Sequence, residues 1–83
     1  MADLEPKERV LKDISMFDES LKLISKVKLD KSMSAVVEMA KLYASDAKSY
    51  LDKGDIFTAF SCISYAHGLM DSILSLVGLN EIF

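Results

Sequence analysis

The feature that most constrains this chain is the run from Ile56 to Val77, which contains no Lys, Arg or Glu. Its notable ionisable side chains are those of His67 and Asp71. A surface helix of a small soluble protein normally carries a charged stripe that faces water. A helix without such a stripe must be covered on most sides, either by the rest of the chain or by a partner.

Length and composition predict one all-α domain that spans residues 1–83. Of these 83 residues, 51% are hydrophobic and 28% are charged, while only three are Gly and one is Pro. Such a composition is rich in helix formers and poor in the turn residues that a many-stranded sheet needs. The formal net charge of -3 leaves no excess positive charge to neutralise phosphates, so nucleic acid is not an expected partner.

Cys62 is the single cysteine and lies in an apolar run, so an internal disulfide is impossible and a reducing, cytoplasmic setting is expected. The N-terminal residues carry charges where a signal peptide needs an uninterrupted apolar core, and export is therefore not expected. The run 56–77 has the length of a membrane span. Its Ser, Thr, His and Asp residues and its lack of flanking cationic anchors argue against a membrane location.

Hydrophobic periodicity predicts a three-helix antiparallel bundle with helices over residues 5–27, 33–53 and 56–77. The first helix opens at Glu5 and Pro6, because Pro is tolerated at a first helical position. Its apolar face recurs at alternating steps of four and three, at Val10, Ile14, Phe17, Leu21 and Ile24. The second helix can be capped by the side chain of Asp30, Ser32 or Ser34, of which Ser32 is favoured.

The sequence Lys53-Gly54-Asp55 predicts a tight turn between the second and third helices. Gly suits the left-handed residue that closes a helix, and Asp suits the cap of the next one. These two helices should therefore form an antiparallel hairpin. Small residues would let its backbones approach closely: Ala40, Ala44, Ala47, Ala59, Cys62 and Ala66.

On a helical wheel, the third helix separates into a buried side and a side of small residues. The expected buried residues are Ala59, Cys62, Ile63, Ala66, Leu69, Met70, Ile73 and Val77. The opposite side, the small-residue ridge, consists of Ser61, Ser64, Gly68, Ser72 and Ser75. Gly inside a helix costs about 1 kcal/mol relative to Ala, which a close-packed partner would offset. Together with Phe57 and Phe60, the ridge is the candidate interface, although its serines could equally be ordinary solvent-facing residues.

Two motifs resemble a known family. They are Tyr43-x-x-Asp46-Ala47-x-x-Tyr50-Leu51-x-Lys53-Gly54-Asp55 and Ile63-Ser64-Tyr65-Ala66-His67-Gly68-Leu69-x-Asp71. Together they resemble the archaeal domain-of-unknown-function family 357 over the second and third helices. The resemblance implies a short three-helix bundle and no assigned activity, so it supports the fold and adds no mechanism.

His67 and Asp71 stand one turn apart, where two helical side chains can interact. The imidazole is expected to hydrogen-bond to Asp71, or to Asp46 or Tyr43 on the neighbouring helix, in a semi-buried polar cluster. Zinc needs three or four protein ligands, and one His with one Cys does not supply them, so no metal or other cofactor is predicted. An acid–base site at His67, Asp71 and Asp46 is the enzymatic alternative. It lacks a nucleophile beside the base, so catalysis is not expected.

These observations predict a non-catalytic protein–protein interaction module. The expected partner is a second copy of the chain, which would form a homodimer through the third helix, because exposed apolar patches mark interfaces. No small-molecule ligand is indicated. The alternative is an adaptor subunit that docks onto a different protein through the same helix or through the apolar tail of residues 79–83.

Overall fold

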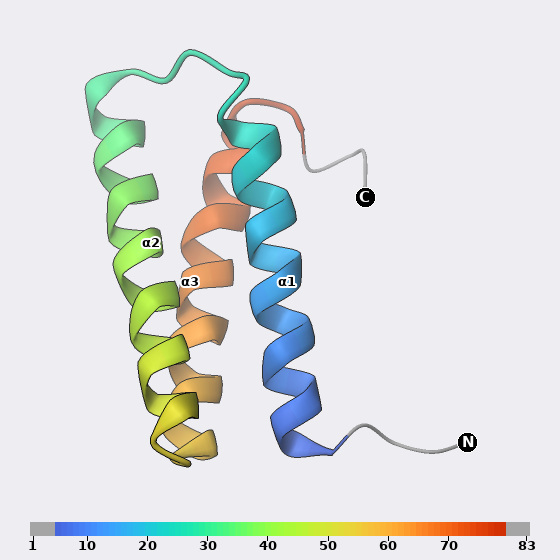
Figure 1. The fold of residues 1–83 in the computed structure, drawn as a ribbon. Coiled ribbons are helices and arrows are strands. Elements are labelled where there is room, and N and C mark those ends of the chain that lie inside the picture. The colour runs from blue at the N-terminus through green and yellow to red at the C-terminus, as the bar shows by residue number, and fades with distance from the viewer. Residues whose placement is uncertain (1–4, 80–83) are drawn as a thin grey trace.

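The computed structural model describes residues 5–79, which form three helices: α1 (Pro6–Ile24), α2 (Lys31–Asp52) and α3 (Ile56–Leu76). The α1–α2 connection and the α2–α3 turn lie at opposite ends of the molecule, so α2 runs antiparallel to both of its neighbours (Figure 1). The contact between α2 and α3 is the most extensive and that between α1 and α2 is the least. The expected all-α three-helix bundle is confirmed.

The first helix begins as expected and ends earlier than expected. Glu5 precedes the helix and Pro6 occupies its first turn. At the other end, the backbone N–H groups of Lys26 and Val27 donate to carbonyls only three residues back, those of Leu23 and Ile24. Such tighter turns are common where an α-helix terminates. Helix α1 therefore stops at Ile24, and the expected bound of residue 27 is wrong.

The second helix is capped by Asp30, and the preference for Ser32 is wrong. One carboxylate oxygen of Asp30 accepts a hydrogen bond from the backbone N–H of Met33 at 2.8 Å. This contact satisfies one of the donors that the first turn of a helix leaves without an intrahelical partner. The helix consequently begins at Lys31, two residues before the expected start, and Ser32 lies exposed within its first turn.

We expect the substitution Asp30→Ala to lower the free energy of unfolding by about 1 kcal/mol, because it removes this cap. The matched control is Ser32→Ala, which should change the free energy by less than about 0.5 kcal/mol, since Ala is a better helix former than Ser. Urea unfolding followed by far-UV circular dichroism measures both values. Equal losses from the two variants would show that Asp30 is not the residue that starts α2.

The turn between α2 and α3 forms as the sequence predicts. Gly54 has φ of 84°, and its N–H donates to Leu51 O at 3.0 Å while that of Asp55 donates to Tyr50 O at 2.9 Å. These two hydrogen bonds form the Schellman motif, which requires a left-handed residue. The Asp55 carboxylate then accepts from the N–H of Thr58 at 3.1 Å. Hydrogen bonds from the Thr58 side chain and backbone hold the pKa of Asp55 below its usual value.

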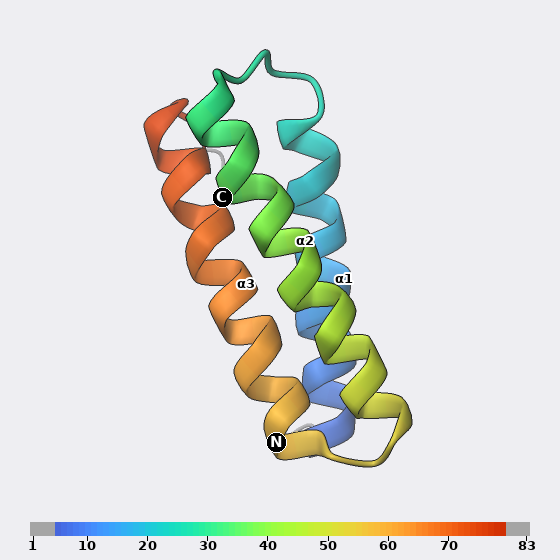
Figure 2. The ribbon, with the colours of Figure 1, turned by 90° about the vertical axis from the view of Figure 1, so that its left-hand side faces the viewer.

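The core lies between all three helices, and α2 stands in front of α3 and α1 in Figure 2. Helix α1 packs mainly on α3 and less on α2. Where α2 meets α3, Ala40, Ala47, Ala59 and Ala66 are all 0% exposed, in line with the expected close approach of the two helices.

The buried side of α3 differs from the expected one at both of its edges. Leu74 is buried, whereas Cys62, Leu69 and Val77 are only half-buried. Leu74 lies two turns after His67, on the side of α3 that α1 covers. Cys62 and Leu69 lie on the other edge, where α2 covers them only in part.

Candidate functional site

The side chain of His67 joins α3 to α1. Its Nε2 lies 2.7 Å from the backbone carbonyl oxygen of Asp13, and its ring meets the Phe17 ring edge-on with centroids 6.0 Å apart. A carbonyl oxygen can only accept, so Nε2 must carry the hydrogen of this bond. Both the neutral imidazole protonated at Nε2 and the imidazolium can make it. The contact therefore positions α1 on α3 in either protonation state.

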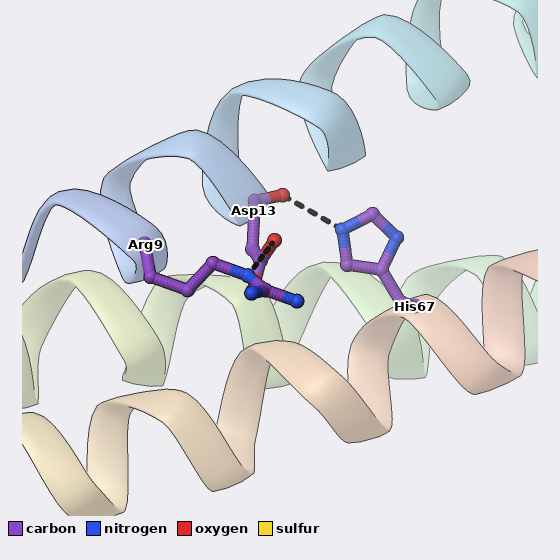
Figure 3. A network of polar contacts seen from close by, with 3 residues as sticks. All are labelled: Arg9, Asp13 and His67. Atoms are coloured by element: carbon purple, nitrogen blue, oxygen red, sulfur yellow. Dashed lines mark hydrogen bonds and ion pairs between the residues drawn. The ribbon is translucent and has the colours of Figure 1, made fainter. Parts of the chain in front are cut away.

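A shallow, open groove surrounds His67 between α1 and α3. Its lining residues are Arg9, Asp13, Met16, Phe60, Ser64, His67 and Asp71. Within it, Nε of Arg9 lies 3.5 Å from a carboxylate oxygen of Asp13, whose side chain is 16% exposed while that of Arg9 is 62% exposed. Figure 3 shows that Asp13 contacts Arg9 through its carboxylate and His67 through its backbone carbonyl. The groove thus combines one cation with two carboxylates and has no excess of positive charge for an anionic ligand.

The four residues of the expected polar cluster are not brought together. His67 faces α1, and Asp71 lies exposed one turn away in the same groove. Tyr43 belongs to the opposite side of α3, where its ring packs edge-on against that of Tyr65 with centroids 4.5 Å apart. Asp46 is one turn from Tyr43 on α2. The hydrogen-bond partner of His67 is therefore none of the three that helical spacing suggested, but a backbone carbonyl 54 residues away.

No side-chain signal in the sequence could have indicated this contact. His67 reaches the backbone carbonyl of Asp13, and every residue type has such a carbonyl. The carboxylate of Asp13 pairs with Arg9 of the same helix instead. Spacing within one helix could not show that the partner would be His67, because α1 had to be placed on α3 first.

Cys62 lies on the α2 side of α3 and is half-buried. Burial raises the pKa of its thiol, and the negative charges of Asp46 and Asp55 raise it further. The thiolate is the nucleophilic form of cysteine, and a raised pKa makes it scarcer at neutral pH. The pKa of Cys62 is therefore shifted in the direction opposite to that of an activated nucleophile.

Within residues 5–79, no group of three or more His, Cys, Asp and Glu side chains is placed to hold a metal ion. Over the same residues, no helix has both the length and the apolar character that crossing a membrane requires. The tail beyond Leu79, which the adaptor alternative invokes, lies outside the described residues.

The candidate interface residues are all at the surface. Phe57 is 84% exposed and Phe60 is 43% exposed, and the five members of the small-residue ridge are exposed. A Cβ atom added to Gly68 would meet nothing within 4 Å. Two ridge hydroxyls, those of Ser61 and Ser72, donate to carbonyls of their own helix, at 3.2 and 2.7 Å. The ridge is thus a narrow open strip along α3, and within one chain nothing packs closely against Gly68.

The sequence interpretation missed a broader surface formed by α2 and α3 together, on the side away from α1. We call it the α2–α3 outer face. From α2 it takes residues spaced by three and four: Val36, Met39, Tyr43, Asp46 and Tyr50. From α3 it takes Thr58, Cys62, Tyr65, Leu69 and Leu76, and it borders the small-residue ridge at Ser72. The contact between the Tyr43 and Tyr65 rings shows that the two rows adjoin.

Comparison with known proteins identifies a family and no activity. Residues 12–79 match the model of the family described as protein of unknown function DUF357. A search among curated proteins gave no match. The family match begins within α1 and runs to the end of the described chain, so it extends beyond the two helices that carry the recognisable motifs. The chain therefore belongs to the DUF357 family.

Proposed function

We propose that the protein is a small non-catalytic protein–protein interaction module that self-associates through a surface that includes α3. One observation carries this proposal. Helix α3 contains no Lys, Arg or Glu, yet it exposes Phe57, Phe60, Tyr65 and Leu76 by 84, 43, 51 and 68%. Large apolar side chains exposed on a helix without Lys, Arg or Glu are typical of an interaction site. Aromatic residues are also enriched in protein interfaces relative to the rest of the surface.

The state of the ionisable groups supports a non-catalytic role. A general base must have a free nitrogen or oxygen within reach of the proton that it abstracts. In His67, Nε2 donates to the carbonyl of Asp13 and the ring packs against Phe17. Among residues 5–79, no carboxylate hydrogen-bonds to the remaining nitrogen, Nδ1, to orient the ring as a base. Asp71 shares the groove of His67 but has an exposed side chain, and the raised pKa of Cys62 disfavours a thiolate nucleophile. The groove is shallow, whereas substrate sites are usually concave and enclose most of the ligand.

Sedimentation equilibrium tests self-association directly. At micromolar concentration we expect a species of twice the 9.2 kDa monomer mass, which dissociates on dilution. A monomer throughout the accessible concentration range would contradict self-association. That result would favour the adaptor alternative, in which a different protein binds the same surface or the tail.

A further inference from the structure

We propose that the α2–α3 outer face is the surface through which two copies of this chain associate, so that α2 and α3 of both copies form a four-helix core. This inference rests on the proposed self-association and specifies where it occurs. It differs from the expectation drawn from the sequence, which placed the contact on the small-residue ridge and the two Phe residues beside it.

The distribution of charge distinguishes the three outer faces of the bundle. The α1–α2 face carries ion pairs, among them Lys48 with Asp18 at 4.0 Å and Lys41 with Glu38 at 2.9 Å. The α1–α3 face carries the ion pair of Arg9 with Asp13. In the two rows of the α2–α3 outer face, Asp46 is the only ionised side chain. At one end of the face, the ammonium of Lys53 lies 5.3 Å from the centre of the Tyr50 ring. Charged residues are depleted at the centre of protein interfaces. The α2–α3 outer face is therefore the one with the composition of an interface.

The shape of this face is suited to the packing of further helices. Val36, Tyr50, Cys62 and Leu69 are half-buried and form its floor. Met39, Tyr65 and Leu76 rise above them, with exposed fractions of 46, 51 and 68%. Residues at steps of three and four form the ridges and grooves through which helices interdigitate. On α2, the row that belongs to the outer face lies beside the row that is buried in the core. Helix α2 therefore has a second apolar row, and no other part of the described chain covers it.

A second copy fits the size and symmetry of the face. Helices α2 and α3 have 22 and 21 residues, and thus lengths of about 32 Å. Two helices side by side, each about 10 Å wide, offer about 600 Å². Two such faces would bury about 1,200 Å² in total, which is the lower end of the range for specific interfaces. The face consists of two antiparallel helices of nearly equal length, so an identical face can cover it completely in a two-fold arrangement.

The decisive experiment compares two neighbouring substitutions in the full-length protein, Tyr65→Glu on the outer face and Ser64→Glu at the edge of the ridge. Both add one negative charge to the same helix at exposed positions. By sedimentation equilibrium, Tyr65→Glu should raise the dimer dissociation constant by about 30-fold or more, the effect of losing a central interface residue. Ser64→Glu should leave the dissociation constant within about threefold, because Ser64 lies outside the outer face, in the groove between α1 and α3. A charge outside the centre of an interface changes affinity little.

A second variant and a second readout exclude a simple loss of folding. Met39→Glu places the charge on α2 and should weaken the dimer as Tyr65→Glu does, while circular dichroism shows that each variant keeps its helix content.

The alkylation rate of Cys62 in the wild-type protein should fall as the protein concentration rises through the dimer dissociation constant, because the second copy would cover the thiol. In Tyr65→Glu that rate should not depend on concentration.

The outcomes separate this inference from the proposed function. A wild-type dimer that survives Tyr65→Glu and Met39→Glu but dissociates with Ser64→Glu or Gly68→Leu would move the contact to the small-residue ridge. That result would overturn the inference and leave self-association intact. A monomeric wild type would overturn both self-association and its location. The uncovered outer face would then be a binding site for a different protein.

Discussion

Replacing Phe17 with Ala is expected to lower the free energy of unfolding by about 3 to 5 kcal/mol. Phe17 is 1% exposed and is among the largest fully buried side chains of the core. Its ring also supports the edge-on contact with His67, whose Nε2 holds α3 to α1. Small domains are stable by only about 5 to 15 kcal/mol, so the cavity would remove a large part of the total.

The matched control for this prediction is Phe57→Ala. Phe57 is 84% exposed and lies outside the α2–α3 outer face, so its truncation should change the free energy of unfolding by less than about 0.5 kcal/mol. Urea titrations should measure the free energy of unfolding of both variants at the same protein concentration, because dimer formation would add stability that depends on concentration. Comparable losses at the two positions would mean that the core is not centred where α1 meets α3.

The substitution Ala47→Leu should lower the free energy of unfolding by about 1 to 3 kcal/mol. Ala47 is 0% exposed at the contact between α2 and α3, where equally buried Ala59 and Ala66 stand on the facing helix. Three additional carbon atoms have no space there unless the two backbones separate. Separation would also loosen the neighbouring core, since close-packed interiors transmit such strain.

Ser45→Leu provides the control on the same helix. Ser45 is exposed, so the larger side chain enters solvent and the helix gains propensity. We expect a change smaller than about 0.5 kcal/mol in thermal or urea unfolding. If Ala47→Leu proved as neutral as Ser45→Leu, the two helices could not be in close contact at this position.

Local stereochemistry explains why parts of the fold were predictable. The turn at Gly54 and Asp55 was predicted to the residue, because a left-handed glycine and a capping carboxylate act only on their immediate neighbours. The start of α2 was predictable only to within two residues. Asp30, Ser32 and Ser34 all have capping side chains, and the choice between them depends on the path of the chain that arrives from α1.

The candidate site was less predictable, because its contacts connect distant parts of the chain. The pair of His67 and Asp71 was plausible from its spacing, but the imidazole instead reaches the carbonyl of Asp13 on α1. Likewise, Asp46 and Tyr43 were expected near His67, and they lie on the α2 side of α3 instead. Periodicity states which residues share a face of one helix, but it does not state which other helix that face will meet.

The chain's sequence alone determined three helices, the hairpin turn, and a third helix without a charged stripe. These properties follow from side-chain chemistry within one or two helical turns. The tertiary structure decided how that apolar helix is covered: α1 takes the side with His67, α2 takes the side with Cys62, and the small-residue ridge stays open. It also joined one row of α2 to one row of α3 in the α2–α3 outer face. The relative rotation of packed helices is set by the simultaneous packing of all three, so no single segment contains that information.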